Sequence, residues 1–204
     1  MKLIILEGPD GVGKSTQAQS LVKALGAKLV VQPSSDNCLG FLRPIVKTSQ
    51  NIDPFARQLL HTCSHIVDAY EDFGFHNPAI VMDRCYASAL VYGRMTGLPQ
   101  EQLDILRTIH QGVYSPLIQK YGYQVYYVQF TANAPLRIAE SADFYEKTTK
   151  FKGIQHAYLD LFDQITQNKL FSETEQHLLL NIEGKTPDHI SNELVNFIKK
   201  PLSL

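Results

Sequence analysis

The chain has 204 residues, 44% of them hydrophobic, with 19 Lys and Arg against 20 Asp and Glu and a formal net charge of −1. This balance supplies neither the basic field that favours a nucleic acid partner nor the acidic excess of a solvated tail. The length fits a single domain over residues 1–204, and because the apolar runs are only strand-sized we expect no transmembrane helix and no membrane partner.

The first predicted elements are a strand and a helix joined by a glycine-rich loop. The apolar run Lys2–Leu6 is typical of a buried strand and leaves no room for a signal peptide, and residues 15–25 predict a helix. Between them, Gly8–Thr16 reads GPDGVGKST and fits the P-loop pattern of Gly, four residues, Gly, Lys and Ser or Thr. Its glycines let backbone N–H groups point at phosphate oxygens, beside the positive end of the helix dipole.

This loop predicts the groups that hold ATP and Mg²⁺. Lys14 can reach the β- and γ-phosphates, and the Ser15 hydroxyl can ligate Mg²⁺. The residues expected to hold the ATP phosphates are Gly8, Asp10, Gly11, Val12, Gly13, Lys14, Ser15 and Thr16.

Predicted strands and helices alternate along the rest of the chain. After the first strand, strands are expected at Lys28–Val31, Ala79–Met82, Gln124–Phe130 and Leu178–Ile182. Helices are expected at Ser15–Leu25, Pro54–Phe73, Ala87–Thr96, Glu101–Gln111, Lys152–Gln167 and Pro187–Lys199. The alternation predicts an α/β fold, the three-layer P-loop NTPase arrangement with a parallel sheet of about five strands flanked by helices.

Asp83 and Arg84 directly follow the strand expected at Ala79–Met82. Ligands of parallel sheets bind at the carboxyl ends of the strands, so both residues should lie beside the P-loop. Asp83 can hold Mg²⁺ through water or accept a hydrogen bond from the Ser15 hydroxyl. The planar guanidinium of Arg84 suits a phosphate. An Asp-Arg dipeptide is more often a surface ion pair. Its position at the end of a strand beside the P-loop favours a binding site here.

The chain resembles the thymidylate kinase family through most of its length. The resemblance rests on the P-loop ending GKSTQ and on the segment DRCYASALVY, in which Asp83, Arg84, Ser88 and Tyr92 have the family's spacing. It implies a deoxynucleoside monophosphate (dNMP) kinase that converts ATP and dNMP to ADP and dNDP, most like an enzyme that forms dTDP from dTMP.

The resemblance also implies roles for single residues. Asp10 matches an aspartate that binds the sugar 3′-hydroxyl, and Tyr92 matches a tyrosine that packs where a 2′-hydroxyl would sit. Arg84 matches the arginine that binds the acceptor phosphate, and Arg43 a second phosphate ligand. The residues expected around the dNMP are Asp10, Pro33, Arg43, His61, His65, Arg84, Ser88 and Tyr92.

The helix expected at 54–73 departs from the family where the base should bind. The family has a Phe that stacks on thymine and, four residues on, an Arg that hydrogen-bonds it; LLHTCSH places His61 and His65 there. Imidazole can stack on a base, but neutral His can accept a hydrogen bond as well as donate one. We therefore expect a base specificity shifted from, or wider than, thymine, for example toward an exocyclic amine or a modified pyrimidine. With Asp68 the two histidines could instead bind zinc, or simply form a packed or solvated helix face.

A second departure concerns the catalytic arginine of the family. Asp10-Gly11-Val12 in the P-loop lacks it, and the expected lid at approximately 134–152 has Phe144 where an Arg is expected. Positive charge must still offset the charge on the transferring phosphoryl group. The lid candidates are Arg137, Lys147, Lys150 and Lys152, with a solvated helix face as the alternative. The residues expected to carry catalysis are Lys14, Arg84, Arg137 and Lys147.

The cysteines and the helix expected at 54–73 bear on location and assembly. The three cysteines include no C-x-x-C pair, which favours reduced thiols and a cytoplasmic protein. Apolar residues on more than one side of the helix at 54–73 permit a homodimer, although they could face only the subunit's own core. The expected partners are therefore ATP, a dNMP and a second copy of the chain, and no nucleic acid.

Two other functions would also use a P-loop. A deoxynucleoside kinase needs a carboxylate base, usually a Glu after the second strand, and Gln32-Pro33-Ser34 lacks it. A nucleotide-dependent switch or binding protein needs an Asp-x-x-Gly segment and, for guanine, an Asn-Lys-x-Asp element; neither occurs after the P-loop.

Overall fold

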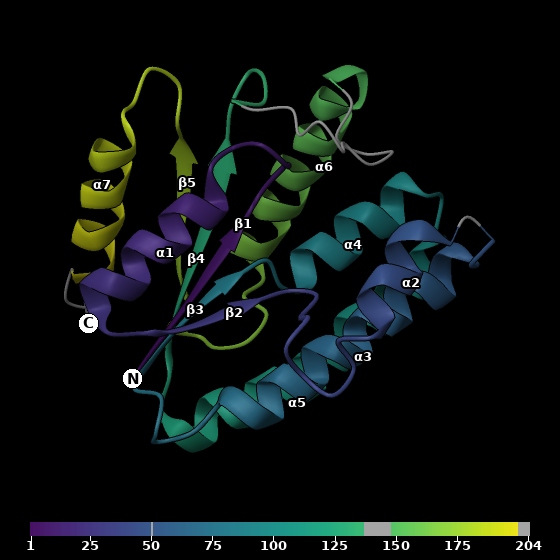
Figure 1. Ribbon diagram of the computed structural model, residues 1–204, viewed down its shortest axis with the longest axis horizontal. Coiled ribbons are helices and arrows are strands. Elements are labelled where there is room, and N and C mark those ends of the chain that lie inside the picture. Colours follow the sequence, from purple (N-terminus) through teal and green to yellow (C-terminus); the bar gives the residue numbers. More distant parts are fainter. Residues whose placement is uncertain (50, 137–147, 200–204) are drawn as a thin grey trace.

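The computed structural model describes residues 1–49, 51–136 and 148–199. Its centre is a five-stranded sheet in the order β2-β3-β1-β4-β5, in which every neighbouring pair is parallel (Figure 1). The strands are β1 Lys2–Glu7, β2 Lys28–Val31, β3 Ala79–Asp83, β4 Gln124–Thr131 and β5 Gln176–Asn181. The predicted α/β fold class and the predicted strands are confirmed, and the strand ends shift by at most two residues.

Helices connect the strands, as each parallel crossover requires. They are α1 Lys14–Leu25, α2 Leu42–Thr48, α3 Pro54–Asp72, α4 Tyr86–Met95, α5 Gln100–Tyr121, α6 Thr148–Gln167 and α7 Pro187–Lys199. The sequence did not predict α2, a single short helix of 7 residues. It also ended α5 too early, because the helix continues through Pro116 until Gly122 caps it in a left-handed conformation. Burial of Tyr114, Leu117 and Ile118 offsets the cost of the internal proline.

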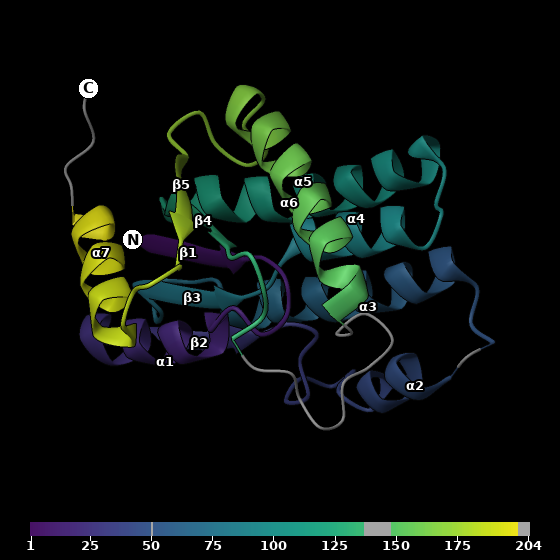
Figure 2. The same ribbon diagram turned by 90° about the horizontal axis from the view of Figure 1, so that it is seen from above.

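Two hydrophobic cores lie on opposite faces of the sheet. Leu3 and Ile5 of β1 pack with α3, α4, α5 and α6, whereas Ile4 and Leu6 pack with α1 and α7. Figure 2 shows these two helix layers on either side of the strands. Because both faces are covered, β1 is apolar at each of these positions, and all four side chains are fully buried.

The carboxyl ends of the three strands β1, β2 and β3 meet at one edge. Just past the strands, the Arg84 N–H donates to the Leu6 carbonyl at 3.0 Å, and the Gln32 N–H donates to the Asp83 carbonyl at 3.0 Å. The P-loop, the Asp83-Arg84 pair and the loop after β2 are therefore fixed side by side. In the part of the chain that the structure describes, every helix is too short or too polar to cross a membrane.

Candidate active site

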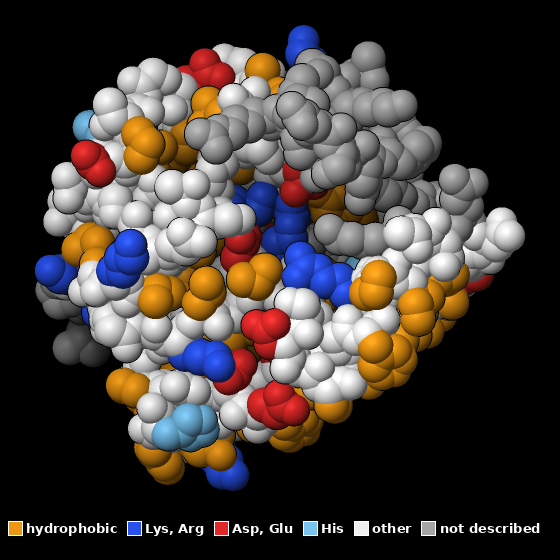
Figure 3. Space-filling view, in the orientation of Figure 1, with side chains coloured by type: hydrophobic (Ala, Val, Ile, Leu, Met, Phe, Trp, Pro, Cys, Tyr) orange, Lys and Arg blue, Asp and Glu red, His pale blue; other side chains and the backbone are white. Residues whose placement is uncertain are grey.

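A cleft of about 1200 Å³ opens at this edge of the sheet. It is lined by the P-loop, the ends of β2 and β3, the helices α2, α3 and α4, and the start of α7. Figure 3 shows the hollow on this face, with Lys and Arg side chains gathered in it. Small-molecule pockets commonly measure about 300–1,000 Å³, so this cleft is larger than is usual for one small ligand.

The P-loop has the backbone shape that an anion site needs. Gly13 caps α1 in a left-handed conformation with φ 84°, without a side-chain hydrogen bond, which leaves the first N–H groups of the helix directed at the cleft. Gly8 has φ 141°, and a Cβ there would lie 2.7 Å from the Phe130 carbonyl oxygen. Both positions therefore require glycine if the loop is to keep this path against β4.

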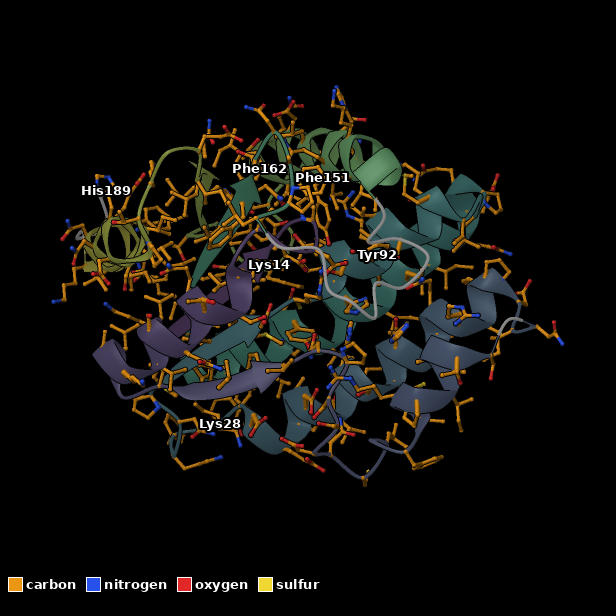
Figure 4. All side chains as sticks on the ribbon, turned by 45° about the horizontal axis from the view of Figure 1, so that its top comes forward. Lys14, Lys28, Tyr92, Phe151, Phe162 and His189 are labelled. Atoms are coloured by element: carbon orange, nitrogen blue, oxygen red, sulfur yellow. The ribbon has the colours of Figure 1, made fainter. Side chains whose placement is uncertain are left out.

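Lys14 is the cation at the centre of this loop. Its Nζ donates to the Pro9 carbonyl at 2.6 Å, and Figure 4 shows Lys14 at the start of α1, across the cleft from Tyr92 on α4. Burial and the nearby Arg84 charge lower the pKa of Lys14 to about 8, against the attraction of neighbouring carboxylates. Phosphate oxygens in the loop would favour the ammonium form and raise this pKa again.

We therefore expect Lys14 to take up a proton when a nucleoside triphosphate binds above pH 8. Below that pH Lys14 is already charged, so affinity should be nearly independent of its titration. Above that pH the free protein has neutral Lys14, and affinity should fall as pH rises. Calorimetry at pH 8.5 in buffers of different ionisation enthalpy measures the proton uptake, and Lys14→Ala should abolish it. Uptake that is absent in the unmodified protein would contradict the assignment.

Arg84 links the P-loop to the helices on the other side of the cleft. The residue has φ 76°, in the left-handed region, and its guanidinium forms an ion pair with Asp10. The same group donates to Ser88 Oγ at 2.9 Å, to the Tyr158 hydroxyl at 3.0 Å and to the Gly8 carbonyl at 3.3 Å. These contacts hold a guanidinium at the cleft wall, where it can face a phosphate.

Asp10 and Tyr92 join Arg84 at the same wall. The Tyr92 hydroxyl donates to Asp10 Oδ2 at 2.8 Å, and the Arg84 guanidinium lies 5.6 Å from the centre of the Tyr92 ring. Burial works to raise the pKa of Asp10, but the charges of Arg84 and Lys14 outweigh it and lower the pKa to about 2. Three residues that the sequence assigned to the dNMP are thus brought together.

Glu7, which was not predicted from the sequence, supports this wall of the cleft from the side of the sheet. The side chain is fully buried at the end of β1 and accepts hydrogen bonds from the Cys85 N–H at 2.7 Å, the Ser88 N–H at 3.2 Å and Ser88 Oγ at 2.6 Å. The N-cap residue of α4, Cys85, makes no side-chain cap, so Glu7 caps this helix from a neighbouring strand. Burial raises the pKa of Glu7, and the Arg84 charge opposes that shift.

Ser88 therefore orients Arg84 as well as lining the cleft. Its hydroxyl lies between Glu7, Arg84 and the Tyr158 hydroxyl, 2.8 Å from the latter. Glu7 could have been noticed in the sequence because it is a carboxylate directly after an apolar strand. Tyr158 reaches the site from α6, and no local pattern marks it.

Glu7→Ala is expected to lower the free energy of unfolding by about 2–5 kcal/mol, because it leaves buried N–H and O–H donors without an acceptor. Chemical denaturation with and without the substitution measures the change. Glu173→Ala, at an exposed glutamate, should alter the midpoint little. An unchanged midpoint for Glu7→Ala would show that the α4 cap does not depend on this carboxylate.

Ser15 and Asp83 supply oxygen ligands suited to Mg²⁺. Ser15 Oγ donates to Asp83 Oδ2 at 2.5 Å, and Asp83 is buried at the end of β3. Mg²⁺ is usually held by one or two protein oxygens together with water and substrate phosphates. A hydroxyl and a carboxylate beside the phosphate loop fit that ion.

The far end of the cleft is formed by α2 and α3. Arg43, His61 and His65 line it, together with Arg57 and Gln58, which were not predicted from the sequence. Arg57 donates to the carbonyls of Val46 and Ser49, and so ties the end of α2 to α3. Arg57, His61 and His65 are spaced four residues apart, which places them on one helix face. This spacing could have indicated Arg57 from the sequence.

The structure does not bring His61, His65 and Asp68 together as metal ligands. Asp68 accepts from Asn37 at 2.8 Å and from Gln32 at 3.5 Å, while His65 Nδ1 pairs with His110. Within residues 1–49, 51–136 and 148–199, no group of three or more His, Cys, Asp or Glu is arranged to hold a metal. Zinc binding on this helix is therefore not supported.

The predicted lid falls mostly outside the described residues. Arg137 and Lys147 are not among them, and the side chain of Lys150 is not described either. Lys152 is exposed on α6. Leu136, the last described residue before the gap, lines the cleft, and its N–H donates to the Gly11 carbonyl at 2.9 Å. The segment therefore starts directly over the P-loop.

This fold and this site define a P-loop phosphotransferase. The family model for Thymidylate kinase matches residues 6–182, and the chain belongs to that family. It is accordingly a nucleotide kinase, and members of this family use ATP as the phosphate donor.

Individual relatives agree over nearly the whole length. The chain is 26% identical over 201 residues to a probable thymidylate kinase of Methanococcus maripaludis strain C6, covering 97% of this chain and 94% of the relative. It is 23% identical over 199 residues to a probable thymidylate kinase of Methanocaldococcus jannaschii, covering 96% and 95%.

Solved structures share the fold. The thymidylate kinase of Candida albicans superimposes with a TM-score of 0.74 at 20% identity, covering 97% of this chain and 91% of that chain. The thymidylate kinase of Ehrlichia chaffeensis gives a TM-score of 0.69 at 14% identity, covering 97% and 98%.

Proposed function

We propose that this kinase transfers the γ-phosphoryl group of ATP to a deoxynucleoside monophosphate, forming ADP and a deoxynucleoside diphosphate (dNDP). The reaction is most like the conversion of dTMP to dTDP. One observation carries the proposal: Arg84, Asp10 and Tyr92 form one connected wall directly beside the P-loop. The wall offers a guanidinium for a phosphate, a carboxylate for a sugar hydroxyl and a ring to pack on the sugar.

In this mechanism the ATP phosphates lie on residues 8–16, with Lys14 beside the β- and γ-phosphates. Ser15 and Asp83 would hold Mg²⁺, which supplies charge neutralisation of the phosphates when bound. Ser15 Oγ and Asp83 Oδ2 are in hydrogen-bond contact, which supports the proposal that both contribute to one Mg²⁺ site. The P-loop amides and Lys14 orient the γ-phosphoryl group for in-line attack and stabilise its charge.

The acceptor phosphate lies against Arg84, with Arg43 across the cleft as a second ligand. One of its oxygens attacks the γ-phosphorus. A nucleoside monophosphate is already largely dianionic at neutral pH, since its second pKa is about 6. No general base is therefore required. The lid at 134–152, with Arg137 and Lys147 as its proposed cations, would close over both substrates and exclude water.

The base would lie at the far end of the cleft, against His61 and His65 of α3. Since these are imidazoles, we propose a base preference that is shifted from, or wider than, thymine. We also propose that the chain works in the cytoplasm as one kinase domain that forms a homodimer, in keeping with the exposed Tyr70 on α3, whose side chain is 64% accessible.

ATP consumption with Mg²⁺ against dTMP, dUMP, dCMP, dAMP, dGMP and their ribose counterparts tests the proposal. Turnover that depends on a deoxynucleotide would support the kinase reaction, and the ranking would give the base preference. Strict preference for dTMP would refute the altered specificity while leaving the reaction intact. Slow ATP loss that no monophosphate stimulates would refute the proposed acceptor.

A further inference from the structure

A pair of buried histidines joins α3 to α5 behind the far end of the cleft. His65 Nδ1 lies 3.0 Å from His110 Nε2, and the two side chains are 3% and 0% exposed. The contact is reinforced nearby, because the Tyr114 hydroxyl of α5 donates to the His65 carbonyl at 3.1 Å. His65 lines the cleft, whereas His110 does not.

The hydrogen bonds of His110 determine where its proton lies. His110 Nδ1 is 2.8 Å from the Leu106 carbonyl oxygen. A carbonyl oxygen can only accept, so His110 Nδ1 must carry a hydrogen. In a neutral ring the other nitrogen, Nε2, is then an acceptor. Its partner His65 Nδ1 must be the donor, which leaves His65 Nε2 with a lone pair.

Both rings are neutral under this arrangement, and their surroundings favour it. Burial lowers the pKa of His65, and burial also lowers the pKa of His110 to about 4. The rings that face His110 are those of Tyr86 and Tyr114, each with its centre 6.2 Å away. Among the described residues, no carboxylate forms an ion pair with either histidine that would hold a second proton there.

We propose that His65 presents a hydrogen-bond acceptor, its Nε2 lone pair, to the base of the acceptor nucleotide, and that His110 is the positioning residue that fixes this tautomer. The inference rests on the proposed function, because it takes the far end of the cleft as the base position. Because His65 Nδ1 is hydrogen-bonded to His110, Nε2 is the ring nitrogen of His65 that can hydrogen-bond to a ligand in the cleft.

This assigns a chemical requirement to the substrate. The base must turn an N–H toward His65, such as the ring N3–H of thymine or uracil or the exocyclic amine of cytosine. A base that turned a carbonyl toward Nε2 would leave two acceptors facing each other. An arginine at this position would impose the opposite requirement, because its side chain only donates.

The tautomer can be measured without any activity assay. Long-range ¹H–¹⁵N correlation spectra of protein labelled with ¹⁵N-histidine distinguish protonated from unprotonated ring nitrogens, and the His65→Gln spectrum assigns the His65 signals. At pH 7.5 we expect a protonated Nδ1 and an unprotonated Nε2 on His65. A hydrogen on Nε2, or a doubly protonated ring, would overturn the proposal.

Variants then test the contact with the base. His110→Phe removes the acceptor for His65 Nδ1–H, so we expect about a tenfold higher KM for the preferred dNMP with kcat little changed, and a mixture of His65 tautomers. His110→Gln, whose amide oxygen can accept, should restore much of the affinity. Equal KM values for His110→Phe and the unmodified enzyme would overturn the positioning role.

His65→Arg completes the set, because it supplies only donors. KM for the preferred dNMP should rise about tenfold or more, while His65→Gln, which can still accept, should lose less. A lower KM for His65→Arg with the same dNMP would overturn the proposal. If no monophosphate is phosphorylated at all, the proposed function and the base contact both fail, whereas the spectra still report the tautomer.

Discussion

Lys14→Ala is expected to lower kcat by about 10²–10³, the usual loss when one charge-stabilising donor at a transferring group is removed. The Lys14 ammonium lies inside the P-loop at the cleft, and the guanidinium of Arg84 beside it is already bonded to Asp10. Steady-state rates with saturating ATP and dNMP measure the loss.

Lys23→Ala provides the matched control for this experiment. Lys23 lies on the same helix, α1, but is exposed and does not line the cleft. It should leave kcat unchanged, so a general effect of removing a lysine from α1 can be separated from the effect at the phosphates. A kcat for Lys14→Ala within tenfold of the unmodified enzyme would contradict the P-loop role.

Arg84→Ala is expected to lower kcat/KM for the dNMP by at least about 100-fold. The substitution removes the guanidinium proposed to bind the acceptor phosphate, and a charged hydrogen-bonded group at a reacting phosphate typically contributes on this scale. It also removes the partner of Asp10, so alignment of the sugar should suffer as well. KM for ATP should change far less than KM for the dNMP.

Two further variants sharpen the result. Arg84→Lys keeps the positive charge but loses the planar fork, so its rate should fall between those of the alanine variant and the unmodified enzyme. Arg94→Ala removes an exposed arginine from the same helix, α4, and should have no effect. Normal rates for Arg84→Ala would rule out this residue as the acceptor phosphate ligand.

The elements that could be predicted from sequence are those whose signals are local. The P-loop spacing and the apolar runs of the strands are encoded in consecutive residues, and the strand-end rule placed Asp83 and Arg84 beside the loop. The short helix α2 escaped, because 7 residues with an internal Pro44 give little periodicity. The end of α5 was missed because packing of Tyr114 and its neighbours outweighs the local effect of Pro116.

The supporting contacts of the site could not be read in advance for a related reason. Glu7 meets Ser88 across 81 residues, Tyr158 meets Arg84 across 74, and His65 meets His110 across 45. Such pairs depend on how helices dock onto the sheet, and no spacing in the sequence marks them. The residues proposed to contact the ligands were therefore easier to locate from the sequence than the residues that hold them in place.

The contacts of Arg84 bear on how the binding of one substrate affects the binding of the other. One side chain contacts the Gly8 carbonyl and Asp10 of the phosphate loop while facing the position proposed for the acceptor, and its charge acts on Lys14. Filling either position changes the environment of the same guanidinium. If the acceptor phosphate binds Arg84 as proposed, we expect the two substrates to be coupled: the factor by which ATP changes the affinity for the dNMP equals the factor by which the dNMP changes the affinity for ATP.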